Sequence, residues 1–119
     1  MRKARNIVLA VLAAGGLALA IQPAQAAKPK KKTVKVEDYF FTPAKMTVKR
    51  NTVVVWKWPA GGGDSHDVYM KKGPKGVKRF RSEIFTAGVT YRKKLTKRGT
   101  YRIICTLHED TMKQTIRVK

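Results

Sequence analysis

The residues best suited to metal chemistry are the chain's only cysteine, its two histidines and one methionine. Two residues separate Cys105 from His108, and Met112 follows His108 by four. A cysteine that ends one strand and a methionine that begins the next bring soft donors to one point, with a histidine in the turn between them. His66, at the end of a glycine-rich loop, would have to come from a neighbouring strand. A thiolate, two imidazoles and a weak axial thioether are the ligand set of a mononuclear blue copper site.

Each of these residues also has a purely structural interpretation. A lone buried cysteine is usually a small hydrophobic residue, a histidine near a loop commonly makes surface hydrogen bonds, and a methionine at a strand start commonly packs in the core. The joint pattern is harder to explain in this way, because the only cysteine and both histidines fall in the order of that ligand set. We therefore predict one copper ion held by His66, Cys105 and His108, with Met112 as the weak fourth ligand.

The elements that must position these donors are short β-strands. Apolar and polar residues alternate with period two in four runs, 33–37, 46–49, 100–105 and 113–119, and residues 52–58 are rich in β-branched and aromatic side chains. Glycine, proline and asparagine mark the turns between these runs. No amphipathic helix of ordinary length is evident, so the pattern predicts an all-β fold, an antiparallel β-sandwich in which two sheets bury one face each.

Strand parity agrees with the predicted metal site. Cys105 shares the parity of Tyr101 and Ile103, and Met112 shares the parity of Ile116 and Val118. Since alternate residues of a strand point to the same face, both sulfur-bearing side chains are expected to point into the sandwich.

The start of the chain has the layout of a secretory signal peptide. Three basic residues precede an uncharged run at 7–21, and a small-residue motif at 24–26 follows. The run is shorter than the roughly 20 residues of a membrane span, although an uncleaved anchor is the alternative. We predict a signal peptide at 1–26, a basic flexible tail at 27–32 and a single domain at 33–119. The protein is therefore expected to be exported, to a periplasm or to the cell envelope or exterior.

The balance of charge suggests an anionic partner. The formal net charge is +20, and it remains +17 without the predicted signal peptide, which holds three of the 27 basic residues and none of the seven acidic ones. Such an excess fits an acidic redox protein, or weaker contact with an anionic cell-envelope polymer or membrane surface. The alternative is a solvated surface without a specific partner. Export makes nucleic acid an unexpected target, and we expect a monomer.

Residues Val36 to Val118 resemble the plastocyanin/pseudoazurin/amicyanin branch of the cupredoxin family. The matching motifs are Phe41-x-Pro43, Val54-x-Trp56, Ser65-His66-x-Val68, Phe85-x-x-Gly88, Gly99-Thr100-Tyr101 and Cys105-Thr106-Leu107-His108-x-x-x-Met112. The resemblance implies a Greek-key β-sandwich and one-electron transfer between Cu(I) and Cu(II). Carried over by position, it implies His66, Cys105 and His108 as strong ligands and Met112 as the axial one. It also implies that His108 is the electron port, with Leu107 and Pro43 beside it.

Two departures from the family pattern concern the site. The loop Glu109-Asp110-Thr111 lacks the usual proline after the histidine, and Asp67 occupies a position where relatives often carry Asn, Thr or Ser. A carboxylate that faced the sulfur would favour the oxidised ion, whereas one that faced solvent would have little effect.

Three other functions compete with electron transfer. A copper carrier would use the same ligands, so the sequence separates it poorly from an electron carrier. A metal-free polyanion-binding module fits the charge, but no aromatic stacking platform is evident. An enzyme is the least favoured, because a catalytic copper needs further histidines and both are already assigned. We therefore predict a non-enzymatic blue copper protein that carries single electrons.

Overall fold

The computed structural model describes residue 28 and residues 30–119, so the predicted signal peptide lies outside the described residues. Eight strands follow one another along this part of the chain: β1 (Lys31–Glu37), β2 (Phe40–Thr42), β3 (Lys45–Val48), β4 (Thr52–Lys57), β5 (Tyr69–Lys72), β6 (Thr90–Leu95), β7 (Gly99–Ile104) and β8 (Lys113–Val118). Among the described residues there is no helix whose length and apolar character would suit a membrane crossing.

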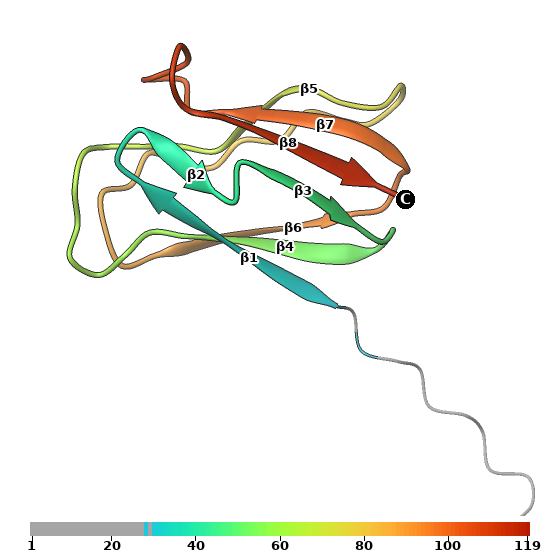
Figure 1. Cartoon of the computed structure of the whole chain (residues 1–119), viewed down its shortest axis with the longest axis horizontal. Helices are drawn as coiled ribbons and strands as arrows, with labels where there is room; N and C mark the ends of the chain where they lie inside the picture. The colour runs from blue at the N-terminus through green and yellow to red at the C-terminus, as the bar shows by residue number, and fades with distance from the viewer. Residues whose placement is uncertain (1–27, 29) are drawn as a thin grey trace, which may run out of the picture.

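The strands form two four-stranded sheets that face each other as a sandwich (Figure 1). Sheet A has the order β2-β1-β4-β6 and sheet B the order β3-β8-β7-β5. The predicted all-β sandwich is confirmed, but its sheets are mixed rather than purely antiparallel. β1 runs parallel to β4, and β3 runs parallel to β8. Alternation of side chains is the same for a strand read in either direction, so the sequence pattern could not reveal these two parallel pairs.

The first strand begins two residues earlier than expected. Lys31 and Lys32 were predicted to belong to a flexible tail, but they pair with Val53 and Val54 of β4. The backbone N–H of Val53 also donates to the carbonyl oxygen of Lys30, at 2.8 Å. Strand pairing satisfies backbone groups and requires no apolar side chain, so a run of lysines whose side chains remain exposed can still form the end of a strand.

The core lies between the inner faces of the two sheets. Val34, Val54 and Trp56 come from sheet A, and Ile103 and Ile116 come from sheet B; all are almost fully buried. Cys105 and Met112 belong to the same cluster of buried residues. Two of the predicted copper donors are therefore held by the close packing that stabilises the domain.

A buried polar bridge connects the two sheets close to Met112. The indole N–H of Trp56 on β4 donates to Oε1 of Gln114 on β8, at 2.9 Å. The side-chain amide of Gln114 donates in turn to the carbonyl oxygen of Pro43, at 2.8 Å. The amide oxygen and the amide nitrogen of Gln114 therefore both have hydrogen-bond partners, which offsets the free-energy cost of burying this side chain. Gln114 thus fixes the start of β8 against β4 and against the turn between β2 and β3.

Candidate metal centre

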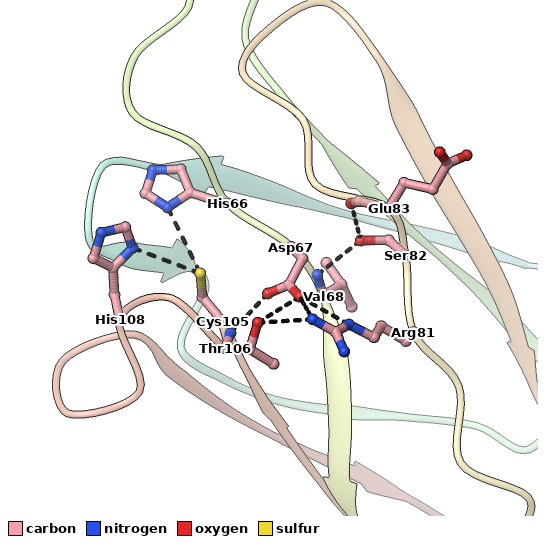
Figure 2. A network of polar contacts seen from close by, with 9 residues as sticks. All are labelled: His66, Asp67, Val68, Arg81, Ser82, Glu83, Cys105, Thr106 and His108. Atoms are coloured by element: carbon pink, nitrogen blue, oxygen red, sulfur yellow. Dashed lines mark hydrogen bonds and ion pairs between the residues drawn. The ribbon is translucent and has the colours of Figure 1, made fainter.

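His66 lies in the segment between β4 and β5, where paired backbone hydrogen bonds hold it. Its N–H donates to the carbonyl oxygen of Phe85 and its carbonyl accepts from the N–H of Phe85, both at 3.0 Å. This isolated bridge fixes the backbone outside any regular strand. The imidazole is consequently buried, and one of its nitrogens is directed toward the sulfur of Cys105 (Figure 2).

Cys105, His108 and Met112 share the compact loop between β7 and β8. The N–H of Cys105 donates to the carbonyl oxygen of Met112, at 3.1 Å, which closes the loop. The N–H groups of His108 and Met112 donate to the carbonyl oxygens of Cys105 and His108, at 3.2 and 2.9 Å. This loop has the arrangement that the sequence predicted, with a cysteine after one strand, a methionine before the next and a histidine in the turn.

Three of the predicted donors converge on one point. The Cys105 Sγ lies 3.9 Å from Nδ1 of His66 and 3.6 Å from Nδ1 of His108 (Figure 2). All three donor atoms lie within 4.8 Å of one another. First-row metals bond imidazole and thiolate at about 2.0–2.3 Å, which at trigonal to tetrahedral angles separates N from S by roughly 3.6–3.8 Å. The spacing therefore fits three ligands of a single ion.

Met112 is placed within the same buried cluster, but as a donor it stays a prediction. Its side chain is fully buried and its backbone is bonded to Cys105 and His108. The chemistry of the donor set is that of copper: a thiolate and two imidazoles in one buried site, with a thioether close in sequence.

Burial raises the pKa of the Cys105 thiol, while the backbone N–H groups of Asp67 and Leu107 act in the opposite direction. Desolvation disfavours the charged thiolate, and N–H donors aimed at the sulfur favour it. A metal ion binds the thiolate and displaces the proton. The N–H groups thus stabilise the form of Cys105 that coordinates a metal.

Asp67 faces neither the sulfur nor solvent. It is 0% exposed, and its carboxylate accepts hydrogen bonds from the backbone N–H and the hydroxyl of Thr106, both at 2.7 Å. The guanidinium of Arg81 lies against the same carboxylate at 3.1 Å and also donates to the Thr106 hydroxyl (Figure 2). Asp67, which follows His66 in the chain, therefore connects this segment to Thr106, which follows Cys105. Arg81 supplies the positive charge that compensates the Asp67 carboxylate.

Asp38 contacts His66, and no local pattern in the sequence indicates this pairing. Nε2 of His66 lies 2.9 Å from Asp38 Oδ1, and when Nδ1 binds a metal the proton is on Nε2, which donates to this carboxylate. This hydrogen bond, and a second from the N–H of Asp64, lower the pKa of Asp38. A carboxylate on the far nitrogen fixes the tautomer and orientation of a ligating histidine. No spacing rule could predict the pair, because the two residues lie 28 positions apart.

Gly63 makes room for that carboxylate. A Cβ atom on Gly63 would lie 2.7 Å from Oδ1 of Asp38, a separation that side chains essentially never show. The glycine run at 61–63, which the sequence analysis assigned only to a turn, therefore also allows Asp38 to approach His66.

Tyr39 and Asp64 flank the two histidines at the surface. The Tyr39 ring lies edge-on to His108, with centroids 5.0 Å apart, and its hydroxyl donates to Asp64 at 3.1 Å. Asp64 Oδ2 lies 3.5 Å from Nε2 of His108. The Ser65 N–H and then the Tyr39 hydroxyl lower the pKa of Asp64, and the same contact with Asp64 raises the pKa of Tyr39. The ring of His108 thus packs against an aromatic ring, and its outer nitrogen faces a carboxylate.

Comparison with known proteins identifies the family. Residues 29–119 match the model of copper-binding proteins of the plastocyanin/azurin family. Among solved structures, a reduced amicyanin mutant aligns with a TM-score of 0.63 at 22% identity, over 73% of this chain and 80% of its own. A Cu(I) amicyanin mutant aligns with a TM-score of 0.64 at 20% identity, over 75% and 82%.

A third similar structure is an enzyme of which this chain matches only a part. The copper-containing nitrite reductase of Thermus scotoductus SA-01 aligns with a TM-score of 0.63 at 28% identity, over 86% of this chain and 26% of its own.

No curated protein matches the chain. The amicyanins share the fold, and the family match extends over the whole described domain. The chain is therefore a copper-binding cupredoxin, a member of the plastocyanin/azurin family.

Proposed function

We propose that the protein is a type 1 copper protein that carries single electrons between extracytoplasmic redox partners. The observation that supports this most directly is that access to the centre is limited to one edge. His66, Cys105 and Met112 are buried, whereas the side chain of His108 is 22% exposed. Small molecules cannot enter such a site, but one ring connects it to the surface. This arrangement favours electron exchange over ligand exchange or substrate binding.

The chain's residues would hold the ligands in place rather than react. Asp38 orients His66, the carboxylate of Asp67 ties the His66 segment to the Cys105 segment, and backbone N–H groups support the thiolate. Bound copper would supply the one-electron change between Cu(I) and Cu(II). Ligands fixed by core packing move little when the charge changes, and small rearrangement favours fast electron transfer.

The surface around His108 is suited to close contact with another protein. The Tyr39 ring packs edge-on against His108, and Leu107 directly precedes His108 in the chain. Both side chains are large and about half exposed. Apolar contact excludes water at the centre of an interface. In this proposal the electron passes through the exposed edge of His108, the partner is an acidic redox protein, and the exported protein acts as a monomer.

We propose a carrier rather than an enzyme, in spite of the likeness to a nitrite reductase. That reductase is about four times as long as the matched region. A catalytic copper would require further imidazoles, and this chain contains only the two histidines that converge with Cys105. The fold match with one part of that enzyme therefore supports a shared architecture and not a shared reaction.

The proposal is tested by adding Cu(II) to the purified protein and recording its visible spectrum. An intense band from charge transfer between the thiolate and copper is expected, and Cys105→Ala should abolish it.

The reduced and oxidised forms should interconvert reversibly at an electrode, with fast electron self-exchange. Rapid loss of copper to an acceptor protein, with slow self-exchange, would instead support copper delivery. A colourless protein that binds copper equally well without Cys105 would contradict the predicted site.

A further inference from the structure

A cationic groove lies on the outer face of sheet B, beside the copper loop. Its volume is about 450 Å³, and it extends over β5, β7 and β8. Its charged lining consists of Lys71, Lys72, Arg79, Arg102, Lys113 and Glu109. Ile104 contributes an apolar floor and is only 5% exposed, although its side chain lies on the outer face of the sheet. The groove thus combines a sheltered apolar floor with a cationic rim.

Strand register explains why so many cations meet there. Lys72 pairs with Arg102 across β5 and β7, and Lys113 pairs with Ile104 across β7 and β8. The register of β5 shifts between Met70 and Lys72, which is a β-bulge. In an unbroken strand Lys71 and Lys72 would point to opposite faces, but a bulge redirects side chains. Both lysines line the groove as a result.

Most of this positive charge is not neutralised within the described part of the chain. Lys71 is bound to Glu109, the only carboxylate in the lining. For Lys72, Arg102 and Lys113 the described residues provide no ion pair, since the four pairs found among them involve other residues. Like charges held close together repel one another, so an anion that entered the groove would relieve an existing repulsion.

The groove adjoins the proposed electron port. Glu109 directly follows His108, Lys113 directly follows Met112, and Ile104 directly precedes Cys105. The immediate surroundings of His108 are not cationic, since Asp64 lies 3.5 Å from its outer nitrogen and Asp38 is hydrogen-bonded to the backbone of Asp64. The positive charge that attracts an acidic partner must therefore lie in the neighbouring groove, and not among the residues that surround His108.

We propose that this groove binds an acidic segment of the protein redox partner, and that this contact aligns the partner over His108. The inference rests on the proposed function and adds the place and chemistry of docking. A concave groove with an apolar floor fits a short stretch of chain that carries both carboxylates and an aliphatic side chain. A lipid surface is too flat to reach the Ile104 floor, and a uniformly charged polyanion has no aliphatic side chain to place against it.

A matched control is available on the opposite side of the molecule. The outer face of sheet A carries Lys35, Arg92 and Lys94, all exposed and spread over β1 and β6. The two sets each contain two lysines and one arginine. Replacing either set with glutamine lowers the net charge by the same amount, so any difference between the variants reports on position and not on total charge.

The test measures binding of a six-residue peptide of alternating Glu and Leu, with blocked ends, to the copper-loaded protein at low ionic strength. Backbone amide shifts should map to β5, β7 and β8. The groove variant, Lys72→Gln with Arg102→Gln and Lys113→Gln, should weaken binding about tenfold, as three partly exposed charge contacts of two- to threefold each would. The control variant, Lys35→Gln with Arg92→Gln and Lys94→Gln, should change it less than about twofold.

Equal weakening by both variants would overturn the proposal, because binding would then follow net charge alone. Amide shifts confined to another face would overturn it as well. So would phosphatidylglycerol vesicles whose binding depends on the groove while peptide binding does not, since the surface would then serve a membrane. Peptide binding requires no electron transfer, so this result can be read whether or not the self-exchange experiment succeeds.

A second experiment tests whether binding in the groove speeds electron transfer to the copper centre. A ruthenium(II) complex attached to the peptide and excited by light should transfer one electron to Cu(II), giving Ru(III) and Cu(I), faster than the same complex free in solution. The groove variant should lose this advantage. Reduction by the free complex serves as the reference for a working centre. A bound peptide that gives no rate advantage would contradict a docking role.

Discussion

At the scale of single residues, the ion pair between Asp67 and Arg81 is the feature that most distinguishes this centre. Burying a carboxylate is costly unless hydrogen bonds and a positive charge compensate for it. Thr106 supplies two hydrogen bonds and Arg81 supplies the charge. The pair therefore permits an acidic residue beside His66 without leaving an isolated negative charge near the sulfur.

Replacement of Arg81 by Gln should lower the reduction potential of the copper centre. The Asp67 charge would lose its compensation, and an uncompensated negative charge close to the metal stabilises Cu(II) relative to Cu(I). The free energy of unfolding should fall by about 1–2 kcal/mol, because the guanidinium is half exposed and its loss is partly screened. Voltammetry and urea unfolding measure the two effects.

Two further variants serve as controls for Arg81. Arg81→Lys keeps the charge but loses the planar contact, so the potential should remain close to that of the original protein while some stability is lost. Arg92→Gln removes a cation of the same type from the outer face of sheet A and should leave the potential unchanged. A potential that responds equally to Arg81→Gln and Arg92→Gln would contradict a local role for the pair.

Replacement of Met112 by Leu should preserve copper binding and colour but raise the reduction potential. The predicted thioether donates weakly to the metal, and its loss destabilises Cu(II) more than Cu(I). Since the two side chains have similar volumes, the cost in stability should be below about 1.5 kcal/mol. Absorption and voltammetry of the loaded variant provide the measurement. Complete loss of copper, or an unchanged potential, would contradict the axial role.

At the scale of elements, the stability of the sandwich near the centre depends on the contact between Gln114 and Trp56. Gln114→Leu should lower the free energy of unfolding by about 2–4 kcal/mol. It would leave the buried Trp56 N–H without a partner, at about 1–3 kcal/mol, and would remove the part-buried hydrogen bond to the Pro43 carbonyl, at about 0.5–1.5 kcal/mol. Urea denaturation followed by tryptophan fluorescence measures the change.

An exposed position on β7 provides the reference for Gln114. Thr100 points away from the core, so Thr100→Ala should change the stability by less than about 0.5 kcal/mol. A similar effect of the two substitutions would show that the bridge between the sheets contributes little.

At the scale of the whole molecule, copper binding should stabilise the fold. The donors come from two distant segments that meet only in the folded state, so the ion binds the native protein in preference to the unfolded chain. At a free copper concentration of about 100 times Kd, linkage adds about 2.7 kcal/mol. In a domain of this size that corresponds to a rise in Tm of roughly 10 °C or more.

Calorimetry with and without copper tests this coupling. A chelator should reverse the rise in Tm, and Cys105→Ala should show little or none of it. If copper raised the Tm of Cys105→Ala as much as that of the original protein, the metal would be binding elsewhere on the surface.

The sequence by itself determined the all-β class, the family and the grouping of His108 and Met112 with Cys105. These features depend on short-range order: alternation fixes which side of a strand is buried, and the spacing Cys-x-x-His followed by Met fits one loop. The pairing of the lysines at the start of β1 could not be predicted in this way, since alternation indicates burial and their side chains are exposed.

Only the tertiary structure decided the direction of strand pairing and the contacts of Asp38, Asp67 and Arg81. The cationic groove likewise depends on a bulge in β5 and on which strands lie side by side in sheet B. Such features join residues that are far apart in the chain, and their geometry is set by how the two sheets pack. Local sequence patterns carry no information on that packing, because the same alternation is compatible with many strand orders.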